Sequence, residues 1–178
     1  MEICEADEQH IPAIQRIYAY HVINGTATFE TEPPDEAEML ARLKKVRAAG
    51  LPWLVAIDGG KVRGYCYLTL YRERCAYQFT LEDSVYIDHQ YQNRGAGKRL
   101  LSHAVLWAEQ NGFRQLVAVV GNSENIASIA LHRSAGFGIT GTLRSVGFKH
   151  GRWLDTVILQ RTLGEGDSAL PKITQRNK

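Results

Sequence analysis

The feature that most constrains the fold is a strand, a glycine-containing loop and a helix in close succession, within the stretch SVYIDHQYQNRGAGKRLL. β-Branched and aromatic residues predict a strand that ends at Ile87. A helix is expected to begin at Gly95 or just after it, because apolar side chains then recur at helical spacing up to residue 108. The apolar run QLVAVV follows and predicts another strand. Such a strand–helix–strand unit is expected to join two parallel strands by a right-handed crossover.

The loop between this strand and helix contains a Q-x-x-G-x-G pattern from Gln92 to Gly97. Free N–H groups at a helix start point toward an anion, and the helix dipole adds favourable charge. A phosphate can approach that backbone closely where no Cβ intervenes, which suits Gly95 and Gly97. Arg94, Lys98 and Arg99 supply fixed positive charge nearby. The pattern therefore predicts a diphosphate site, the alternative being that the glycines only shape a loop before a surface helix.

Two other phosphate-binding patterns do not fit this loop. A dinucleotide fingerprint needs a third glycine three residues after Gly97, where this chain has Leu100. A Walker loop needs a gap of four residues and a Gly-Lys-Ser/Thr ending, which the stretch lacks. The bound group is therefore expected to be neither a dinucleotide nor a nucleoside triphosphate held by a Walker loop.

Hydrophobic periodicity and turn residues place the other elements around this unit. The predicted segments are a strand from Ile3, a helix capped by Asp7 that carries Ile11 to Val22, the loop INGTATFETEPP, a helix over 35–49, strands over 53–57, 63–71 and 77–87, a helix over 95–111, a strand over 115–120, a helix over 125–135 and strands over 137–143 and 153–163. This order predicts an α+β fold with a mostly antiparallel sheet that contains one parallel strand pair. Helices should cover both faces. Residues 1–163 are expected to form one domain, followed by a polar, flexible tail over 164–178.

Composition excludes several classes of protein. The formal net charge of +2 argues against nucleic acid as the main partner. Three cysteines without CxxC spacing predict neither a disulfide framework nor a zinc site, and six histidines without HxxxH spacing predict no other metal site. The polar, acidic N-terminus is no signal peptide, and no apolar run is long enough for a membrane helix. We expect a cytoplasmic protein without membrane contact.

The chain resembles the GCN5-related N-acetyltransferase (GNAT) superfamily, most strongly in SVYI, QNRGAG and NIASIALHRSAGF. Within it, TATFETEPP, PWLVA, TLEDSVYI and VGFKHGRWLD are similar to the phosphinothricin and methionine sulfoximine N-acetyltransferases. The resemblance covers nearly the whole chain before the tail. It implies the GNAT fold and an acetyl-CoA-dependent transfer of an acetyl group to the free amine of a small amino-acid-like molecule. It also implies a homodimer.

The resemblance further implies where acetyl-CoA would lie. The parallel strands, here 83–87 and 115–120, should splay apart, and pantetheine should lie between them like an extra strand. Its expected backbone partners are Val85, Tyr86 and Ile87, and the expected diphosphate residues are Asn93, Arg94, Gly95, Ala96, Gly97 and Lys98. Asn125 and Ser128 match positions that hold the pantetheine arm, although Asn125 is also a favoured helix cap.

Acetyl transfer requires a neutral, deprotonated amine, a polarised thioester carbonyl and protonation of the leaving thiolate. Glu82 is the candidate general base, because it matches the sub-family's acidic position and one-sided burial would raise its pKa. Asp83 should face the other side of the sheet. A main-chain N–H near Ile87 is the expected oxyanion donor. His132 stands where many relatives have a thiolate-protonating Tyr, and is either that acid or a packing residue. The alternative for Glu82 is a solvated surface residue on an edge strand.

An acceptor with a carboxylate would need a cation, and Arg72 and Arg74 are the candidates. Phe29 could form an apolar wall, and the strand edge formed by Cys75, Ala76 and Tyr77 could line the pocket. Each arginine could equally be a solvated hairpin charge. An aromatic, basic hairpin near the end could complete the site or a dimer contact through Lys149, His150 and Trp153.

Three other functions stay open at this point. A cysteine hydrolase would use Cys66 or Cys75, but no nucleophile motif surrounds either residue. The same fold could instead acetylate a protein N-terminus, a lysine or an aminoglycoside. A non-catalytic acyl-CoA-binding sensor is the third alternative, and the presence of Glu82 argues against it.

Overall fold

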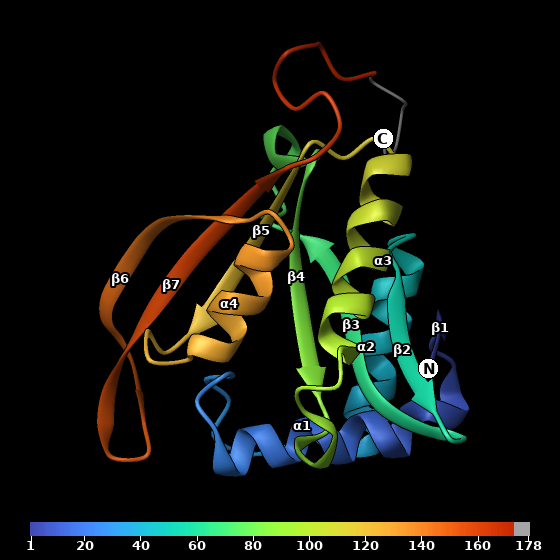
Figure 1. Cartoon of the computed structure of the whole chain (residues 1–178), viewed down its shortest axis with the longest axis vertical. Helices are drawn as coiled ribbons and strands as arrows, with labels where there is room; N and C mark the ends of the chain where they lie inside the picture. Colours follow the sequence, from blue (N-terminus) through green and yellow to red (C-terminus); the bar gives the residue numbers. More distant parts are fainter. Residues whose placement is uncertain (173–178) are drawn as a thin grey trace.

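The computed structural model describes residues 1–172, and its centre is a seven-stranded sheet with the order β1-β2-β3-β4-β5-β7-β6 (Figure 1). The strands are β1 (Glu2–Glu5), β2 (Trp53–Asp58), β3 (Lys61–Leu70), β4 (Thr80–Ile87), β5 (Gln115–Gly121), β6 (Gly138–Lys149) and β7 (Arg152–Thr162). The α-helices are α1 (Ile11–Asn24), α2 (Glu36–Ala48), α3 (Ala96–Gln110) and α4 (Ile126–Ser134). Short 3-10 helices cover Glu8–His10, Cys75–Tyr77 and His89–Tyr91. The order of strands and α-helices is the predicted one.

Local signals explain where the helices begin and end. The side chain of Asp35 accepts a main-chain N–H of the first turn of α2 at 2.8 Å. Gly50 after α2 and Gly112 after α3 have φ angles of +70° and +79°, a left-handed conformation that glycine adopts without steric cost. Asp7 caps the short 3-10 helix that leads into α1, rather than α1 itself.

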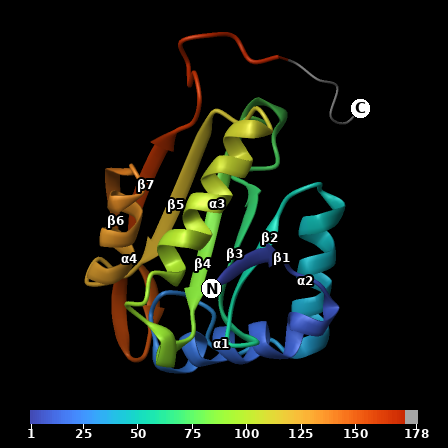
Figure 2. The ribbon, with the colours of Figure 1, turned by 45° about the vertical axis from the view of Figure 1, so that its right-hand side comes forward.

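Successive residues of β4 point to opposite faces of the sheet, and helices cover both. Asp83 approaches His132 of α4 to 2.9 Å on one face. On the other face, the ring centroid of Tyr86 lies 5.0 Å from that of Tyr18 on α1. Figure 2 shows α3 lying along the sheet, whereas α1 and α2 contact each other and also contact β3. The prediction that helices cover both faces of the sheet is therefore confirmed.

The parallel pair formed by β4 and β5 separates before its end. Its pairs run from Thr80 with Gln115 to Asp83 with Ala118. Beyond these residues the strands diverge, as Figure 1 shows. Every other strand pair of the sheet is antiparallel. The predicted splayed pair within a mostly antiparallel sheet is confirmed.

The expected strand over 77–87 begins later than predicted. Residues 75–77 form a 3-10 turn, in which the N–H of Tyr77 donates to the carbonyl of Arg74 at 2.9 Å. The strand β4 begins only at Thr80. The expected strand edge at Cys75, Ala76 and Tyr77 is therefore wrong, because local main-chain hydrogen bonds there replace a ladder.

The strand β6 is longer than the predicted range 137–143 and continues to Lys149. Its pairing with β7 shifts register between Ile139 and Gly141 and again between Leu143 and Gly147. These irregularities break the alternation of apolar and polar residues from which a strand is predicted. The extension forms the long hairpin at the left of Figure 1.

The segment after β7 runs back beside the start of β5. Arg114 donates from Nη1 to the carbonyl of Gly166 at 2.9 Å, and its Nη2 lies 3.6 Å from the carboxylate of Glu165. The tail predicted over 164–178 thus begins with a segment that is bonded to Arg114, and residues 173–178 lie outside the described residues.

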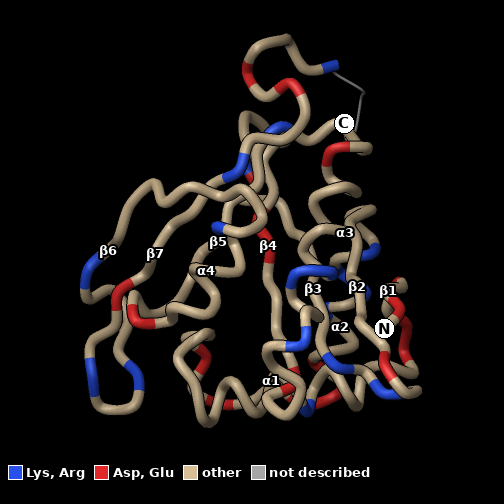
Figure 3. Tube along the Cα trace, in the orientation of Figure 1, with Lys and Arg blue, Asp and Glu red and all other residues tan. Residues whose placement is uncertain are grey.

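Positively and negatively charged residues are both scattered along the trace (Figure 3). Among the described residues, no helix combines the length and apolar character needed to cross a membrane.

Candidate active site

Free peptide groups line the edge of β4 where β5 has turned away. The N–H of Asp88 donates to the carbonyl of Arg63 at 2.8 Å, which fixes the alternation of the β3–β4 ladder. In an antiparallel ladder every second residue turns its peptide groups away from the partner strand. Val85 and Ile87 therefore direct their N–H and C=O groups into the gap between β4 and β5.

Tyr86 and His21 reduce the number of free peptide groups at the end of β4. Tyr86 pairs with Tyr65 and turns its peptide groups toward β3, so the expectation of a third backbone partner at Tyr86 is wrong. His21 places Nε2 2.8 Å from the carbonyl oxygen of Ile87. Burial lowers the pKa of His21, so a neutral ring donates this bond. The N–H of Ile87 remains directed into the gap.

A cavity of about 500 Å³ lies between the end of β4, the loop after it and α4. Its lining includes ten of the residues predicted for coenzyme binding: Val85, Tyr86, Ile87, Asn93, Gly95, Ala96, Gly97, Lys98, Asn125 and Ser128. A smaller cavity of about 50 Å³ lies between β4 and β5 and is lined by Asp83, Ser128 and His132 among others. The structure thus brings together three segments that are distant in sequence.

The two loop glycines are required for different reasons. Gly95 has a φ of +82°, which sets the direction of the chain into α3, and a Cβ there would meet no atom within 4 Å. At Gly97 a Cβ would lie 3.0 Å from Cδ2 of Leu131, so this glycine lets α3 pack closely on α4. Asn93 also has a positive φ, of 59°. The loop therefore has a backbone conformation that most residues would resist.

Arg94 is the predicted diphosphate residue that is missing from the lining of this cavity. Its guanidinium carbon lies 5.0 Å from the ring centroid of Tyr91, and that of Arg63 lies 4.9 Å from the same centroid. The hydroxyl of Tyr91 donates to Asp58 at 2.7 Å. Arg94 thus packs on an aromatic ring at the side of the loop.

Asn125 has the capping role that was one of its two interpretations. Its Oδ1 accepts the N–H of Ser128 at 3.2 Å at the start of α4. Both side chains also face the cavity described above. The cap places these two polar groups beside the free edge of β4.

Asp83 and His132 form a buried pair below the gap. Nε2 of His132 lies 2.9 Å from Oδ2 of Asp83, and Nδ1 lies 2.7 Å from the carbonyl oxygen of Ser128. Both partners are acceptors, which favours a ring protonated on both nitrogens. Burial alone would lower the pKa of His132, but the hydrogen bond and charge of Asp83 outweigh it and raise that pKa.

Glu82 is half-buried on the face of β4 opposite Asp83, as predicted. Burial raises the pKa of Glu82, and the positive charge of Arg72 opposes part of that rise. Arg72 itself is exposed, donates to the carbonyl of Tyr71 at 2.8 Å and lies over the ring of the same residue. A carboxylate in this setting holds a proton more readily than a solvated one.

The other predicted acceptor residues lie apart from the coenzyme cavity. The exposed connection between β3 and β4 contains Arg72, Arg74, Cys75, Ala76 and Tyr77. It precedes the start of β4, whereas the glycine loop follows its end. Of these five residues, Arg72 is the one whose charge acts on the candidate base.

Phe29 packs against the end of β5 and the long hairpin. A Cβ on Gly121 would lie 2.9 Å from Cε1 of Phe29, and a Cβ on Gly147 would meet the other edge of the ring at 2.6 Å. The ring therefore sits between two glycines, with no spare room on either side. This contact holds the loop after α1 close to the gap.

A polar cluster next to Phe29 was not predicted. The guanidinium of Arg42 donates two hydrogen bonds, of 2.7 and 3.0 Å, to the carboxylate of Glu30, and Tyr18 donates to the same carboxylate. Lys149 donates from Nζ to the carbonyl of Thr28 at 2.8 Å. The hydrogen bond from Arg42 lowers the pKa of Glu30, while burial lowers the pKa of Lys149. These residues come from four separate segments, so no sequence spacing links them.

The cysteines and possible metal ligands give no second site. Cys66 is buried, and burial raises its pKa well above the usual value, so its thiol is protonated. Cys4 and Cys75 are also free. Within residues 1–172, no three His, Cys, Asp or Glu side chains gather in a way that could hold a metal ion.

The fold and this geometry agree with comparisons to known proteins. A family model described as the acetyltransferase (GNAT) family matches residues 14–137. The chain belongs to the GNAT family of acetyltransferases. This GNAT acetyltransferase is 53% identical over 165 residues to a phosphinothricin N-acetyltransferase of Alcaligenes faecalis, covering 93% of this chain and 84% of that one.

Other relatives of this GNAT acetyltransferase differ in the acceptor that they are named for. An L-methionine sulfoximine/L-methionine sulfone acetyltransferase of Salmonella typhimurium is 36% identical, over 93% of this chain and 96% of its own. The structure of a phosphinothricin acetyltransferase from Sinorhizobium meliloti, in complex with acetyl-CoA, superposes with a TM-score of 0.94 at 43% identity, covering 97% and 93%. A ribosomal-protein-alanine N-acetyltransferase from Brucella melitensis superposes with a TM-score of 0.89 at 35% identity, covering 92% and 100%.

Proposed function

We propose that this GNAT acetyltransferase transfers an acetyl group from acetyl-CoA to the free amine of a small amino-acid-like molecule such as phosphinothricin or methionine sulfoximine. The observation that carries the proposal is the free edge of β4, which leads into the glycine loop, so that strand and loop line one cavity. The names of the relatives support the acceptor.

In this proposal the backbone of Val85 and Ile87 receives the amide groups of pantetheine in the gap. The main-chain N–H groups of the loop, from Asn93 to Lys98, hold the diphosphate, and the Lys98 ammonium adds charge. Arg94 acts from the side, since it packs on Tyr91. The residues present therefore fit a long, flexible molecule with a peptide-like arm and an anionic end.

Glu82 is the proposed general base. Its raised pKa keeps it basic enough to accept a proton from the acceptor's ammonium, directly or through an ordered water. The N–H of Ile87 is the proposed donor to the carbonyl oxygen that becomes negative during attack. The carbonyl of Ile87 is engaged by His21, which holds the following peptide group in place on the other side of the same residue.

His132 is the proposed acid for the leaving thiolate. Its ring lines the small cavity between β4 and β5. Because Asp83 favours the protonated ring, His132 holds a proton and a positive charge close to where the thiolate forms. The bond to Ser128 keeps the ring in this orientation.

Acceptor binding is proposed to use Arg72 and Arg74 for the carboxylate and Phe29 as an apolar wall. Cys75, Ala76 and Tyr77 would add to the pocket from the exposed turn that contains them. Because this turn lies away from the coenzyme cavity in one chain, we also propose that the pocket is completed in a homodimer. The exposed side chains of Val146, Phe148 and Trp153 on the long hairpin support such a contact.

The proposal is tested by measuring thiol release from acetyl-CoA with three acceptors: phosphinothricin, methionine sulfoximine and an alanine N-terminal peptide. Strong turnover of the first two, with none for the peptide, is the expected result. The likeness to the Brucella structure makes N-terminal alanine the second candidate acceptor. Turnover of the peptide alone would overturn the acceptor and keep the acetyl transfer.

The base is tested by replacing Glu82 with Gln. We expect kcat to fall by about 10²–10⁴-fold, the usual contribution of a positioned base. Glu2→Gln, at an exposed position on the edge strand β1, is the matched control and should keep full activity. Unchanged kcat in Glu82→Gln would remove Glu82 from the mechanism.

The dimer is tested by light scattering on the purified chain. Trp153→Asp on the hairpin should produce a monomer, whereas Ile23→Asp, at another exposed apolar position on α1, should not. A wild-type chain that is monomeric at high concentration would contradict the proposal.

We also propose a cytoplasmic location, supported by the three free thiols and testable by cell fractionation.

A further inference from the structure

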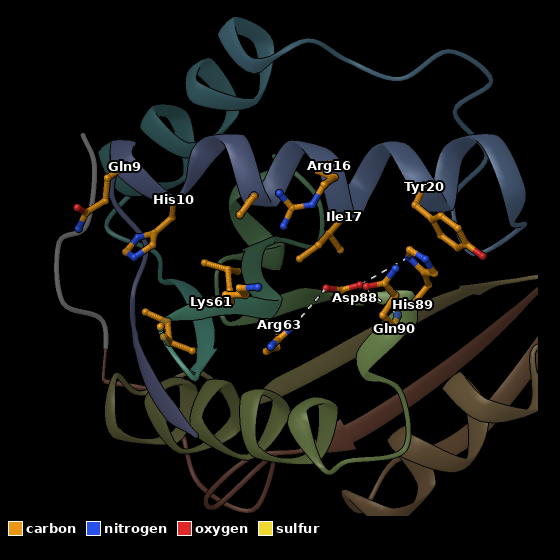
Figure 4. Close-up of a pocket in the computed structure, with 14 residues that line it drawn as sticks. Gln9, His10, Arg16, Ile17, Tyr20, Lys61, Arg63, Asp88, His89 and Gln90 are labelled. Atoms are coloured by element: carbon orange, nitrogen blue, oxygen red, sulfur yellow. Dashed lines mark hydrogen bonds and ion pairs between the residues drawn. The ribbon is translucent and has the colours of Figure 1, made fainter.

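A second large cavity lies on the other side of the connection between β4 and α3 (Figure 4). Its volume is about 800 Å³, and it is bounded by α1, by the β2–β3 turn and by residues 88–90. It shares no lining residue with the cavity of about 500 Å³ assigned to the coenzyme. The proposed reaction makes no use of it.

Positive charge dominates the lining. Arg16, Lys61 and Arg63 carry positive charge at neutral pH, against the single carboxylate of Asp88. Figure 4 shows the charged ends of these cations turned toward a common space, with Asp88 at one side. That carboxylate is already engaged, because it accepts the N–H of Gln90 at 3.1 Å and lies 4.0 Å from Arg63.

Several donors in the cavity have no protein partner. Neither Arg16 nor Lys61 forms an ion pair with an acidic residue in the described part of the chain. Nε of Arg63 is buried and donates to no acceptor of residues 1–172. Because that nitrogen is shielded from solvent, an anion in the cavity would meet the exposed part of the Arg63 side chain, together with Arg16 and Lys61.

The arrangement fits phosphate better than a lone carboxylate. A carboxylate is satisfied by one guanidinium fork, whereas a phosphate offers oxygens in several directions to cations that converge from different elements. His10 and His89 stand at the rim and add positive charge when protonated. Tyr20 stacks on His89 with the ring centroids 3.8 Å apart, which gives the rim a flat aromatic surface.

We propose that this cavity binds a small phosphate-bearing anion at a site separate from the coenzyme site. Arg16 approaches the anion from α1, and Lys61 and Arg63 approach it from β3. The proposal does not depend on the reaction proposed above, because binding is measured without turnover.

The test uses chain saturated with coenzyme A, so that the glycine loop is filled, and titrates it with inorganic pyrophosphate. Amide NMR signals of Gly60 and Gln90 should shift and saturate, while that of Gly95 should not. Absence of shifts at Gly60 and Gln90 would overturn the proposal. So would equal shifts from sodium acetate or sodium chloride at the same ionic strength.

Variants then assign the site to the named cations. The double variant Arg16→Gln/Lys61→Gln should weaken pyrophosphate binding at least about tenfold, as expected for two lost charge-assisted contacts. Lys45→Gln/Arg47→Gln removes the same charges from exposed positions on α2 and should leave the affinity unchanged. Equal affinities in the two double variants would place the pyrophosphate elsewhere and overturn the assignment.

Discussion

Replacing Gly147 by Ala should strain the contact that seats Phe29 beside the candidate active site. A Cβ at this position would lie 2.6 and 2.9 Å from Cδ2 and Cζ of the ring, and closer still to Cε2. The ring cannot move away freely, because its opposite edge lies so near the backbone of Gly121 that a Cβ added there would come within 2.9 Å of Cε1. Overpacking of this kind typically costs about 1–3 kcal/mol. For a chain of this size, about 2 kcal/mol lowers Tm by roughly 4–8 °C.

Urea unfolding at a single protein concentration measures the change in the free energy of unfolding. Gly141→Ala is the matched control, because it lies in the same strand and a Cβ there would meet no atom within 4 Å. In a Phe29→Ala background the penalty of Gly147→Ala should vanish, so the double-mutant cycle should show a coupling of about 2 kcal/mol. Additive effects, or equal stability of the variants at 147 and 141, would refute the packing argument.

The change at 147 should also affect the reaction. Since Phe29 is the proposed wall of the acceptor pocket, Gly147→Ala should raise KM for the acceptor more than KM for acetyl-CoA. Thiol-release kinetics at varied concentrations of each substrate separate the two constants. An unchanged acceptor KM would show that Phe29 serves packing alone.

Four further predictions concern the proposed chemistry and the binding of the coenzyme. Arg72→Gln should raise the pKa of Glu82 further, so the acid limb of kcat/KM should move to higher pH; a limb that stays in place would contradict this coupling. His132→Gln should lower kcat. The ion pair of His132 with Asp83 should stabilise the fold fully below the unfolded histidine pKa and lose this contribution as pH rises through the raised folded pKa, which pH-dependent unfolding of Asp83→Asn would test. Gly95→Ala should weaken coenzyme A binding and lower the free energy of unfolding by about 1 kcal/mol, because a φ of +82° disfavours any residue with a Cβ. Calorimetry measures the affinity for coenzyme A, and an unchanged affinity would contradict this prediction.

The sequence was sufficient for elements whose signals are local. Asp35, Gly50 and Gly112 mark helix ends by capping chemistry, and the structure has those ends where expected. The splayed strand pair followed from the resemblance, and the register of β4 with β5 confirmed it. The turn at 75–77 was missed because its hydrogen bonds arise in the local backbone and leave no apolar period.

The site was predictable one residue at a time, but its contacts were not. Asp83 and His132 were each noted, yet 49 positions separate them and only the fold brings them within 2.9 Å. The hydrogen bond from Lys149 to the main-chain carbonyl of Thr28 joins residues 121 positions apart. The sequence alone could equally have placed Lys149 in solvent. Tyr86 shows the opposite error, because the choice of which peptide groups face the gap depends on strand register and not on residue type.

The separation of β4 from β5 makes the stability of the folded chain depend on what binds between the two strands. A sheet that stops pairing after Asp83 and Ala118 lacks the neighbour that would shield its middle from water. Any molecule that occupies the gap and binds only the folded form adds to stability by mass action, about 2.7 kcal/mol at a hundredfold excess over Kd. The amides of Val85 and Ile87 should therefore exchange with deuterium quickly in the protein alone and slowly when a ligand lies between β4 and β5. A cell rich in acetyl-CoA would then keep this enzyme intact for longer than a starved one.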